Sequence, residues 1–440
     1  MKRLAICVII GLIAMPASAQ LLSGLGQAAG GLTNGLPSVG GLPLIGGLTG
    51  APASGRITSE PLGALGGFAG GIVPNASSLL DQRRVRLRAL VRDNTKLLAV
   101  DGDGNPVRRN ELLAVDLSAV QAAAARAAGF IIVREDSDTL VRTTVLQPPK
   151  RMALKRALAN LRTALPGADI DYNHVYEPAG MALQPGGTPR PGGPVGVSIG
   201  LIDGGVAAHP ALSASRIEQR GFAGPVAATG HGTAIASLLV GQASGFGGAA
   251  VGASLLVADV YGGSAANGSA EAIARALAWL DERGARIVNI SLVGPANLLV
   301  ERAIAATRKH GILIVAAVGN DGPAAPPLYP ASYPGVIAVT GVDARDRALA
   351  EAGRAGHLDY AAPGADIAAA LPGGGFALVR GTSFAAPLVA ARLAANGNSL
   401  ALVNAEARPA RGGNAGLGIV CGGCRNAVPA ILKKKRGGRE

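Results

Sequence analysis

Cysteine is scarce in this chain, which has three in 440 residues. Cys7 lies in the apolar N-terminal stretch, so only Cys421 and Cys424, in Cys-Gly-Gly-Cys, remain for the rest of the protein. Too few further ligands lie nearby for a zinc site, and no thioredoxin-like βαβ pattern surrounds the pair, which leaves a redox-active thiol pair as the weaker alternative. We therefore expect a local disulfide, whose short loop adds little global stability.

Long hydrophobic runs are missing after the N-terminus. The mean hydropathy is +0.33, but Gly, Ser, Thr and His interrupt even the uncharged stretch 221–258, which indicates a buried α/β core. Residues 1–19 have the three parts of a secretory signal: Lys2-Arg3, an apolar stretch, and Ala17-Ser18-Ala19. We expect a secreted or periplasmic protein with no integral membrane segment after signal removal; an uncleaved anchor is the alternative.

The net charge of +13 is unevenly distributed. Residues 195–425 are close to neutral, and the basic run Lys433–Arg436 lies in a short tail, 426–440. This tail is typical of a frayed, solvated end, with weak attachment to an anionic surface as the alternative, so no nucleic-acid partner is expected. Carboxylates form no run at a recognisable calcium-ligand spacing, so the sequence assigns no metal site.

Three short motifs supply an acid, a base and a hydroxyl in a fixed chain order. Asp203 ends an apolar run, His231 lies between two glycines, and Ser383 precedes a helix of small residues in which Pro387 is expected in the first turn. A histidine activates a serine by removing its proton, and a carboxylate orients the imidazole. Each residue alone has an ordinary explanation as a cap or turn residue. Together, in this order, they indicate a catalytic triad.

The order Asp, His, Ser resembles that of the subtilisin-like serine peptidases (subtilases) and differs from the orders in α/β-hydrolases and chymotrypsin. The resemblance covers residues 195–395. It implies a serine endopeptidase that acts on polypeptides through an acyl-enzyme, with Asn320 and the Ser383 amide as oxyanion donors. Further matching segments are His209-Pro210, Asn289-Ile-Ser291-Leu292, Tyr329–Pro334 and Ala362-Pro363-Gly364.

The resemblance also implies a substrate-binding edge and a pocket. Ser291, Leu292, Val293 and Gly294 correspond to the strand that pairs with an extended substrate, and Ala317, Val318 and Gly319 to the segment beside the residue before the cut. Val293 and Val318 replace smaller residues of the family, which favours a small apolar pocket. Calcium is allowed by the resemblance alone. The other histidines, His174, His209, His310 and His357, are expected at solvent-facing or turn positions.

The N-terminal half divides into three further segments. Residues 20–75 are Gly- and Leu-rich and are predicted to be a flexible low-complexity segment. Residues 76–178 show a β-α-β-β-α-β pattern, a ferredoxin-like α+β unit that resembles the subtilase prodomain, an intramolecular inhibitor of the zymogen; an independent small domain is the alternative. Residues 179–194 are predicted to be a Pro/Gly linker, with maturation cleavage within 176–194.

Residues 195–425 are predicted to form the catalytic domain. Strands alternate with helices, which indicates a mostly parallel sheet with helices on both faces and a site at the strand ends. The sequence as a whole predicts a secreted serine endopeptidase that processes its own precursor. The alternative is an inactive peptidase scaffold that binds peptides or acts as a structural surface protein. The predicted strands are 197–202, 254–261, 287–292, 312–318 and 336–342, and the helices 233–240, 269–283 and 298–310.

Overall fold

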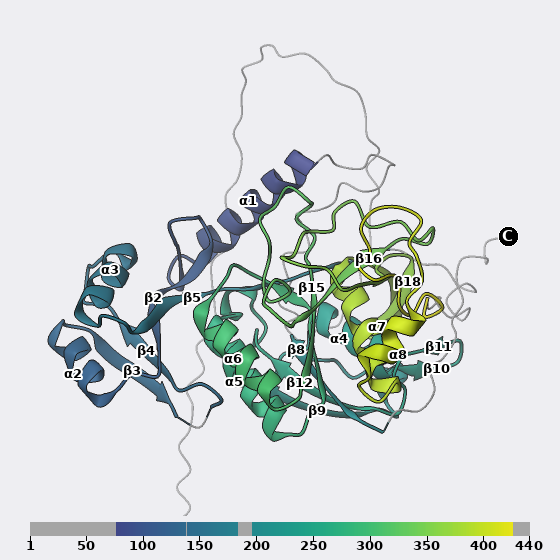
Figure 1. Cartoon of the computed structure of the whole chain (residues 1–440), viewed down its shortest axis with the longest axis horizontal. Coiled ribbons are helices and arrows are strands. Elements are labelled where there is room, and N and C mark those ends of the chain that lie inside the picture. The colour runs from purple at the N-terminus through teal and green to yellow at the C-terminus, as the bar shows by residue number, and fades with distance from the viewer. Residues whose placement is uncertain (1–75, 138, 184–195, 426–440) are drawn as a thin grey trace, which may run out of the picture. The chain divides into compact units, whose positions relative to one another are not determined.

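The computed structural model describes residues 76–137, 139–183 and 196–425 (Figure 1). The predicted signal, the low-complexity segment, most of the predicted linker and the basic tail lie outside the described residues.

The larger part of the fold is built on a sheet of seven parallel strands in the order β17-β16-β15-β13-β8-β12-β9. This confirms the predicted α/β class with a mostly parallel sheet. Five strands lie where apolar runs predict them, whereas β9 and β17 were not predicted. Both are edge strands, where charged residues and a proline are tolerated. The strands are Ser198–Asp203 (β8), Arg216–Gly221 (β9), Ser254–Asp259 (β12), Ile287–Ile290 (β13), Leu313–Ala317 (β15), Ile337–Val342 (β16) and Tyr360–Pro363 (β17).

Two hydrophobic cores lie on the two faces of this sheet. Alternate strand residues point to opposite faces, so Leu255 and Val257 join one buried cluster while Leu256 and Ala258 join the other. The first cluster contains residues of helices α4 and α7, and the second those of α5 and α6. These helices span Gly230–Val240 (α4), Ala270–Glu282 (α5), Leu298–Lys309 (α6) and Thr382–Ala395 (α7), and a short α8 (Leu400–Glu406) follows.

Residues 76–178 form a smaller unit around an antiparallel sheet with the path β3-β4-β2-β5. From β2 onward its elements follow the β-α-β-β-α-β order that the sequence predicts. Helix α1 and strand β1, which precede this order, were not predicted. The elements are Ala76–Asp93 (α1), Leu98–Val100 (β1), Pro106–Val115 (β2), Ala119–Ala127 (α2), Ile131–Asp136 (β3), Thr143–Gln147 (β4), Leu154–Ala164 (α3) and Asp169–His174 (β5).

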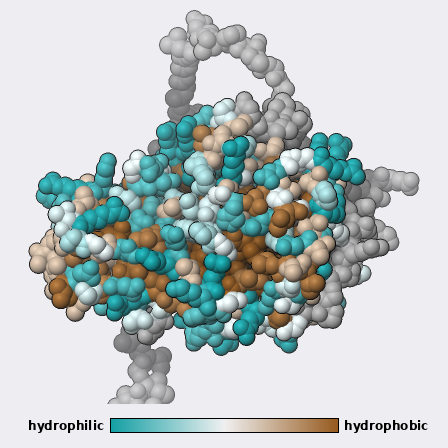
Figure 2. Space-filling model, in the orientation of Figure 1, coloured by the Kyte–Doolittle hydropathy of each residue, from teal (hydrophilic) through white to brown (hydrophobic). Residues whose placement is uncertain are grey.

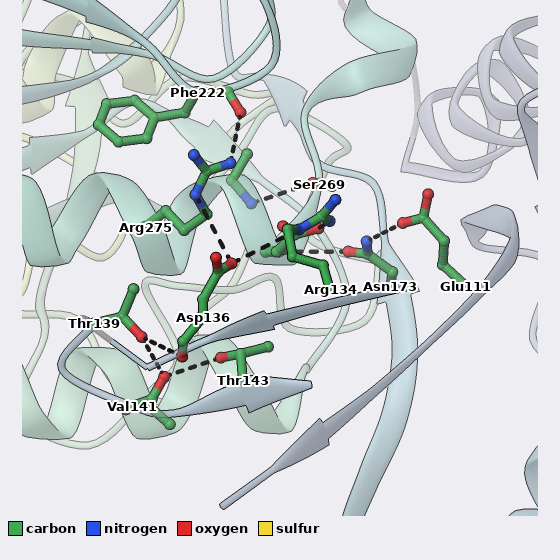
Figure 3. A network of polar contacts seen from close by, with 12 residues as sticks. Glu111, Arg134, Asp136, Thr139, Val141, Thr143, Asn173, Phe222, Ser269 and Arg275 are labelled. Atoms are coloured by element: carbon green, nitrogen blue, oxygen red, sulfur yellow. Dashed lines mark hydrogen bonds and ion pairs between the residues drawn. The ribbon is translucent and has the colours of Figure 1, made fainter. Parts of the chain in front are cut away.

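Polar contacts join the smaller unit to the N-terminal end of α5 (Figure 3) and to that of α6. The side-chain amide oxygen of Asn173 accepts from the backbone N–H of Glu271 at 3.4 Å, and the Asp171 carboxylate accepts from that of Leu298 at 3.0 Å. Both donors belong to first turns, which have no partner within their own helix. Burial raises the pKa of Glu271, although Arg134 of β3 pairs with its carboxylate. Side chains of the smaller unit therefore cap the N-terminal ends of α5 and α6 in the larger unit.

Short strands that follow the smaller unit pair with strands of the larger part outside its seven-stranded sheet. Glu177–Pro178 (β6) pairs with Leu292–Val293 (β14), and Met181–Leu183 (β7) forms a three-stranded sheet with Ile367–Leu371 (β18) and Gly375–Arg380 (β19). The structure thus places strands where the sequence predicts the end of a domain and the start of a linker. Their partners come from far along the chain, so local composition does not reveal them. A separate hairpin joins Gln242–Ala243 (β10) to Phe246–Gly247 (β11).

The last described residues have little regular structure, but they are tied to the sheet. Ile419 bridges to Ala361 of β17, and Cys421 and Cys424 form the predicted disulfide. Figure 2 shows hydrophilic residues over much of one face, with hydrophobic residues gathered across its middle. No helix among the described residues is both long and apolar enough to span a bilayer.

Helix α7 contains an internal proline whose effect is compensated. The prediction that Pro387 lies in the first turn is wrong, because α7 begins at Thr382. Proline has no N–H, so the carbonyl of Ser383, four residues earlier, loses its helical donor. The hydroxyl of Ser291 donates to that carbonyl at 2.9 Å and in turn accepts from the Asn289 amide at 2.8 Å. This chain ties the start of α7 to the end of β13.

We expect Ser291→Ala to lower the free energy of unfolding by about 1–3 kcal/mol, because the buried Ser383 carbonyl would lose its donor. Adding Pro387→Ala supplies a backbone N–H at the right helical spacing, so the double variant should be more stable than Ser291→Ala alone. Urea unfolding of both variants and of Ser213→Ala, an exposed serine, would measure this. A double variant no more stable than the single one would contradict the compensation.

Candidate active site

The structure brings Asp203, His231 and Ser383 together in a buried row. The Nδ1 of His231 lies 2.9 Å and 3.0 Å from the two carboxylate oxygens of Asp203, and its Nε2 lies 2.9 Å from the Oγ of Ser383. All three residues are buried, and Ser383 has no exposed surface. They come from the end of β8, the first turn of α4 and the first turn of α7, segments separated by up to 180 residues.

Close packing of α4 on the end of β8 sets the position of His231. The Thr229 side chain caps α4 by accepting from the backbone N–H of Gly232 at 2.9 Å. A Cβ atom on Gly232 would overlap the backbone of Gly204, directly after Asp203. Small residues on both sides therefore allow the imidazole to reach the carboxylate.

Two N–H donors converge on a single carbonyl oxygen beside Ser383. The Asn320 side-chain amide donates to the Ala179 oxygen at 2.7 Å, and the Ser383 backbone N–H donates to the same oxygen at 3.0 Å. The other end of the Asn320 amide accepts from the Thr382 backbone N–H at 3.0 Å, which fixes its orientation. Gly381 has a φ of +140°, and a Cβ there would lie 3.0 Å from the Asn320 amide. Asn320 and Ser383, which the sequence predicts as oxyanion donors, thus donate to one and the same carbonyl oxygen.

Residues 176–180 lie through the site as an extended strand. The backbone N–H of Tyr176 donates to Gly268 at 2.7 Å, and that of Ala179 donates to Ser291 at 3.1 Å. Between these two bonds, β6 pairs antiparallel with β14. A Cβ on Gly180 would overlap the Ser383 hydroxyl and the ring of Phe384, so Gly180 lies directly against Ser383.

The side chains of Tyr176 and Ala179, both on this strand, are buried. Tyr176 has no exposed surface and donates from its hydroxyl to the Pro295 carbonyl at 2.9 Å. Burial raises the pKa of the Tyr176 phenol well above its ordinary value, so it is a neutral donor. Ala179 is 3% exposed and belongs to the same buried cluster as Val293 and Leu328.

The predicted substrate-binding residues divide into two groups. Ser291, Leu292 and Val293 pair with the strand, and a Cβ on Gly294 would overlap the Tyr176 ring. The second group lies behind Asn320: the N–H of Gly319 donates to the Thr382 hydroxyl at 3.1 Å, Ala317 is buried in β15, and Val318 donates to the Val339 carbonyl of β16.

Sequence reasoning missed Gly268, which accepts from the strand, and Thr382 and Asn289, which support Ser383. Gly268 belongs to no motif, whereas Asn289 lies in a matching segment and Thr382 directly precedes Ser383, but neither pattern reveals the contact that the residue makes. The expectation for His174 is wrong: it is buried, with Nε2 at 3.2 Å from the Asp101 carboxylate and Nδ1 at 3.0 Å from the Asn297 amide. His209 has the expected turn role, since its Nδ1 accepts from Ala211. The described part of the chain holds no cluster of three or more His, Cys, Asp or Glu side chains suited to a metal ion.

Residues 195–400 are similar to known proteins. A family model described as the Subtilase family (Peptidase S8) matches residues 195–400. Subtilisin Savinase of Lederbergia lenta is 33% identical over 205 residues, which cover 44% of this chain and 74% of that protein. The alkaline protease of Alkalihalobacillus alcalophilus is 33% identical over 205 residues, or 44% of this chain, and the match spans only 52% of its length.

A solved structure shows the same fold. Fervidolysin from Fervidobacterium pennivorans, described as a keratinolytic enzyme related to subtilisin, aligns with a TM-score of 0.62 at 20% identity. The alignment covers 71% of this chain and 60% of fervidolysin. From the family match and the identity to Savinase, the chain belongs to the subtilase family of serine peptidases, as its motifs predict.

Proposed function

We propose that this protein is a serine endopeptidase made as a precursor, and that it cuts its own chain between Ala179 and Gly180. One observation carries the proposal: the Ala179 carbonyl oxygen accepts from both Asn320 and the Ser383 amide, while the Ser383 hydroxyl lies against Gly180. A peptide bond in this position is arranged for attack, because the donors are already in place for the charge that develops on its oxygen.

The reaction follows from the contacts. His231 takes the proton of Ser383 as the Oγ bonds to the Ala179 carbonyl carbon, and Asp203 stabilises the imidazolium. The negative charge on the Ala179 oxygen is held by Asn320 and the Ser383 N–H. His231 then gives its proton to the Gly180 nitrogen as the C–N bond breaks, which leaves Ala179 as an ester on Ser383. A water molecule, deprotonated by His231, hydrolyses this ester and frees a carboxyl group at Ala179.

The described residues before the cut would act as the protein's own inhibitor. Residues 176–179 occupy the place of a substrate strand along β14, so no second peptide can pair there while they remain. The polar contacts of Asn173 and Asp171 with α5 and α6 support continued docking after the cut. The signal-like residues 1–19 support a secreted or periplasmic location, and external polypeptides are the substrates we propose for the processed enzyme.

An inactive scaffold that binds peptides is the second candidate. The observation that favours it is the backbone pairing of residues 176–179, which would hold a peptide without any chemistry. The two candidates differ in whether the Ala179–Gly180 bond is cut.

We expect purified wild-type protein to yield a fragment that begins at Gly180, whereas Ser383→Ala stays intact because it has no nucleophile. Asn320→Ala should slow the cut about 10²–10³-fold, since one oxyanion donor is lost. Intact-mass and N-terminal analysis over time measure both effects. An uncut wild type that is folded would support the inactive scaffold, and equal cutting of Ser383→Ala would indicate an outside protease.

We expect Gly180→Ala to slow the same cut by at least about tenfold, because the added methyl group displaces the bond from Ser383 and small misplacements are costly. Gly196→Ala is the matched control, since a Cβ there meets nothing within 4 Å. The rate at which the precursor band disappears measures the difference. Equal rates for the two variants would contradict the placement of Gly180 against Ser383.

A further inference from the structure

A four-residue ionic cluster lies beside the proposed cleavage site. The Nη2 of Arg86, on α1, is 2.8 Å from an Asp321 carboxylate oxygen and 3.3 Å from the Glu177 carboxylate. The Nε of Arg83, one turn earlier on α1, is 2.9 Å from the other oxygen of Asp321. Burial opposes the charge on Arg86, but Glu177 and Asp321 more than offset this and raise its pKa. Two cations thus balance two carboxylates.

The proposed cut divides this cluster. Arg83, Arg86 and Glu177 precede Ala179 and leave together, whereas Asp321 stays in the processed enzyme, next to Asn320. Asp321 is only 5% exposed in the precursor, and both arginines that pair with it lie on α1. The nearby Glu351 is paired with Arg380 at 2.7 Å, so that pair is balanced by itself. Processing therefore leaves a carboxylate at the substrate strand without the cations that it had.

The position of Glu177 shows which substrate residue this carboxylate meets. Counting back from the cut bond, Ala179 is the first residue, Pro178 the second and Glu177 the third. Glu177 and Asp321 accept from the same guanidinium nitrogen of Arg86. The Glu177 carboxylate and the Asp321 carboxylate are therefore bridged by a single nitrogen atom of Arg86. A lysine or arginine at this position is longer than glutamate and brings its own cation to the place of that nitrogen.

On the basis of the proposed peptidase function, we propose that Asp321 is a specificity-determining residue that selects a basic side chain three residues before the cut bond. In the precursor, Arg86 of α1 is the cation that pairs with Asp321. Because Arg86 also pairs with Glu177, a glutamate can occupy the third position before the cut bond. In the processed enzyme a glutamate there faces the charge of Asp321 directly, and like charges at close range repel.

The test uses processed wild-type enzyme, obtained from the full chain, and three peptides that copy residues 174–183 with Glu, Gln or Arg in place of residue 177. We expect kcat/KM to fall in the order Arg, Gln, Glu. The Arg and Glu peptides should differ by at least about tenfold, because one charge-assisted hydrogen bond contributes a factor of this size. Raising the salt from about 0.1 M to about 1 M should shrink this ratio, because the screening length falls from about 10 Å to about 3 Å.

Asp321→Asn should bring the kcat/KM values of the Arg and Glu peptides within about threefold of each other, a ratio that does not depend on the overall activity of the variant. Glu218→Gln removes one carboxylate that is paired with Arg283 on the surface, and it should keep the full preference. Equal rates for the three peptides in the wild type, or a preference retained by Asp321→Asn, would overturn the proposal. If Asp321→Asn does not fold, the order of kcat/KM for the three peptides with the wild-type enzyme, and its dependence on salt, still test the proposal. An uncut precursor with no peptide hydrolysis would instead refute the proposed function, and this inference with it.

Discussion

The carbonyl oxygen of Ala179, held by two N–H donors, is the contact on which the rest of this structure depends. Both donors are ready only because other groups hold them: the Asn320 amide is oriented by Thr382, and the start of α7 is tied to Ser291. The strand that carries Ala179 is in turn placed by Gly268 and by β14. The smaller and the larger part of the fold meet at this strand. The contacts of α1, β3 and β5 with the larger part all favour the position of Ala179 beside Ser383.

Much of the site was predictable because its parts are local motifs. Asp203, His231, Ser383 and Asn320 each stand at the end of a strand or the start of a helix, with small neighbours that leave a trace in the sequence. The parallel sheet was predictable for a similar reason, since its central strands are continuous apolar runs. The order of elements in 106–174 also followed from alternation and turn residues.

The remaining features depend on contacts between distant segments. Helix α1 is rich in arginine and has no strong apolar stripe, and the cations that explain its placement pair with Asp321, more than 200 residues away. Strands β6 and β7 are short, and they exist because β14 and β19 offer them free edges. His174 was expected near solvent because the residues around it in the sequence do not indicate that Asp101 and Asn297 contact it. Pro387 was misplaced because the sequence does not reveal that Ser291 replaces its missing donor.

The pairing of β7 with β19 has a consequence for the direction of the chemistry. If the chain is cut after Ala179, the new amino group of Gly180 is not released into solution, because the next residues remain hydrogen-bonded to β19. A tethered amine beside an ester has a very high effective concentration, so it competes with water for the acyl group on Ser383 and can remake the bond. Separation of β7 from β19 therefore favours hydrolysis of the ester over re-formation of the bond. The strength of this small sheet, which contains none of the residues Asp203, His231 and Ser383, would influence how long the protein remains a single chain.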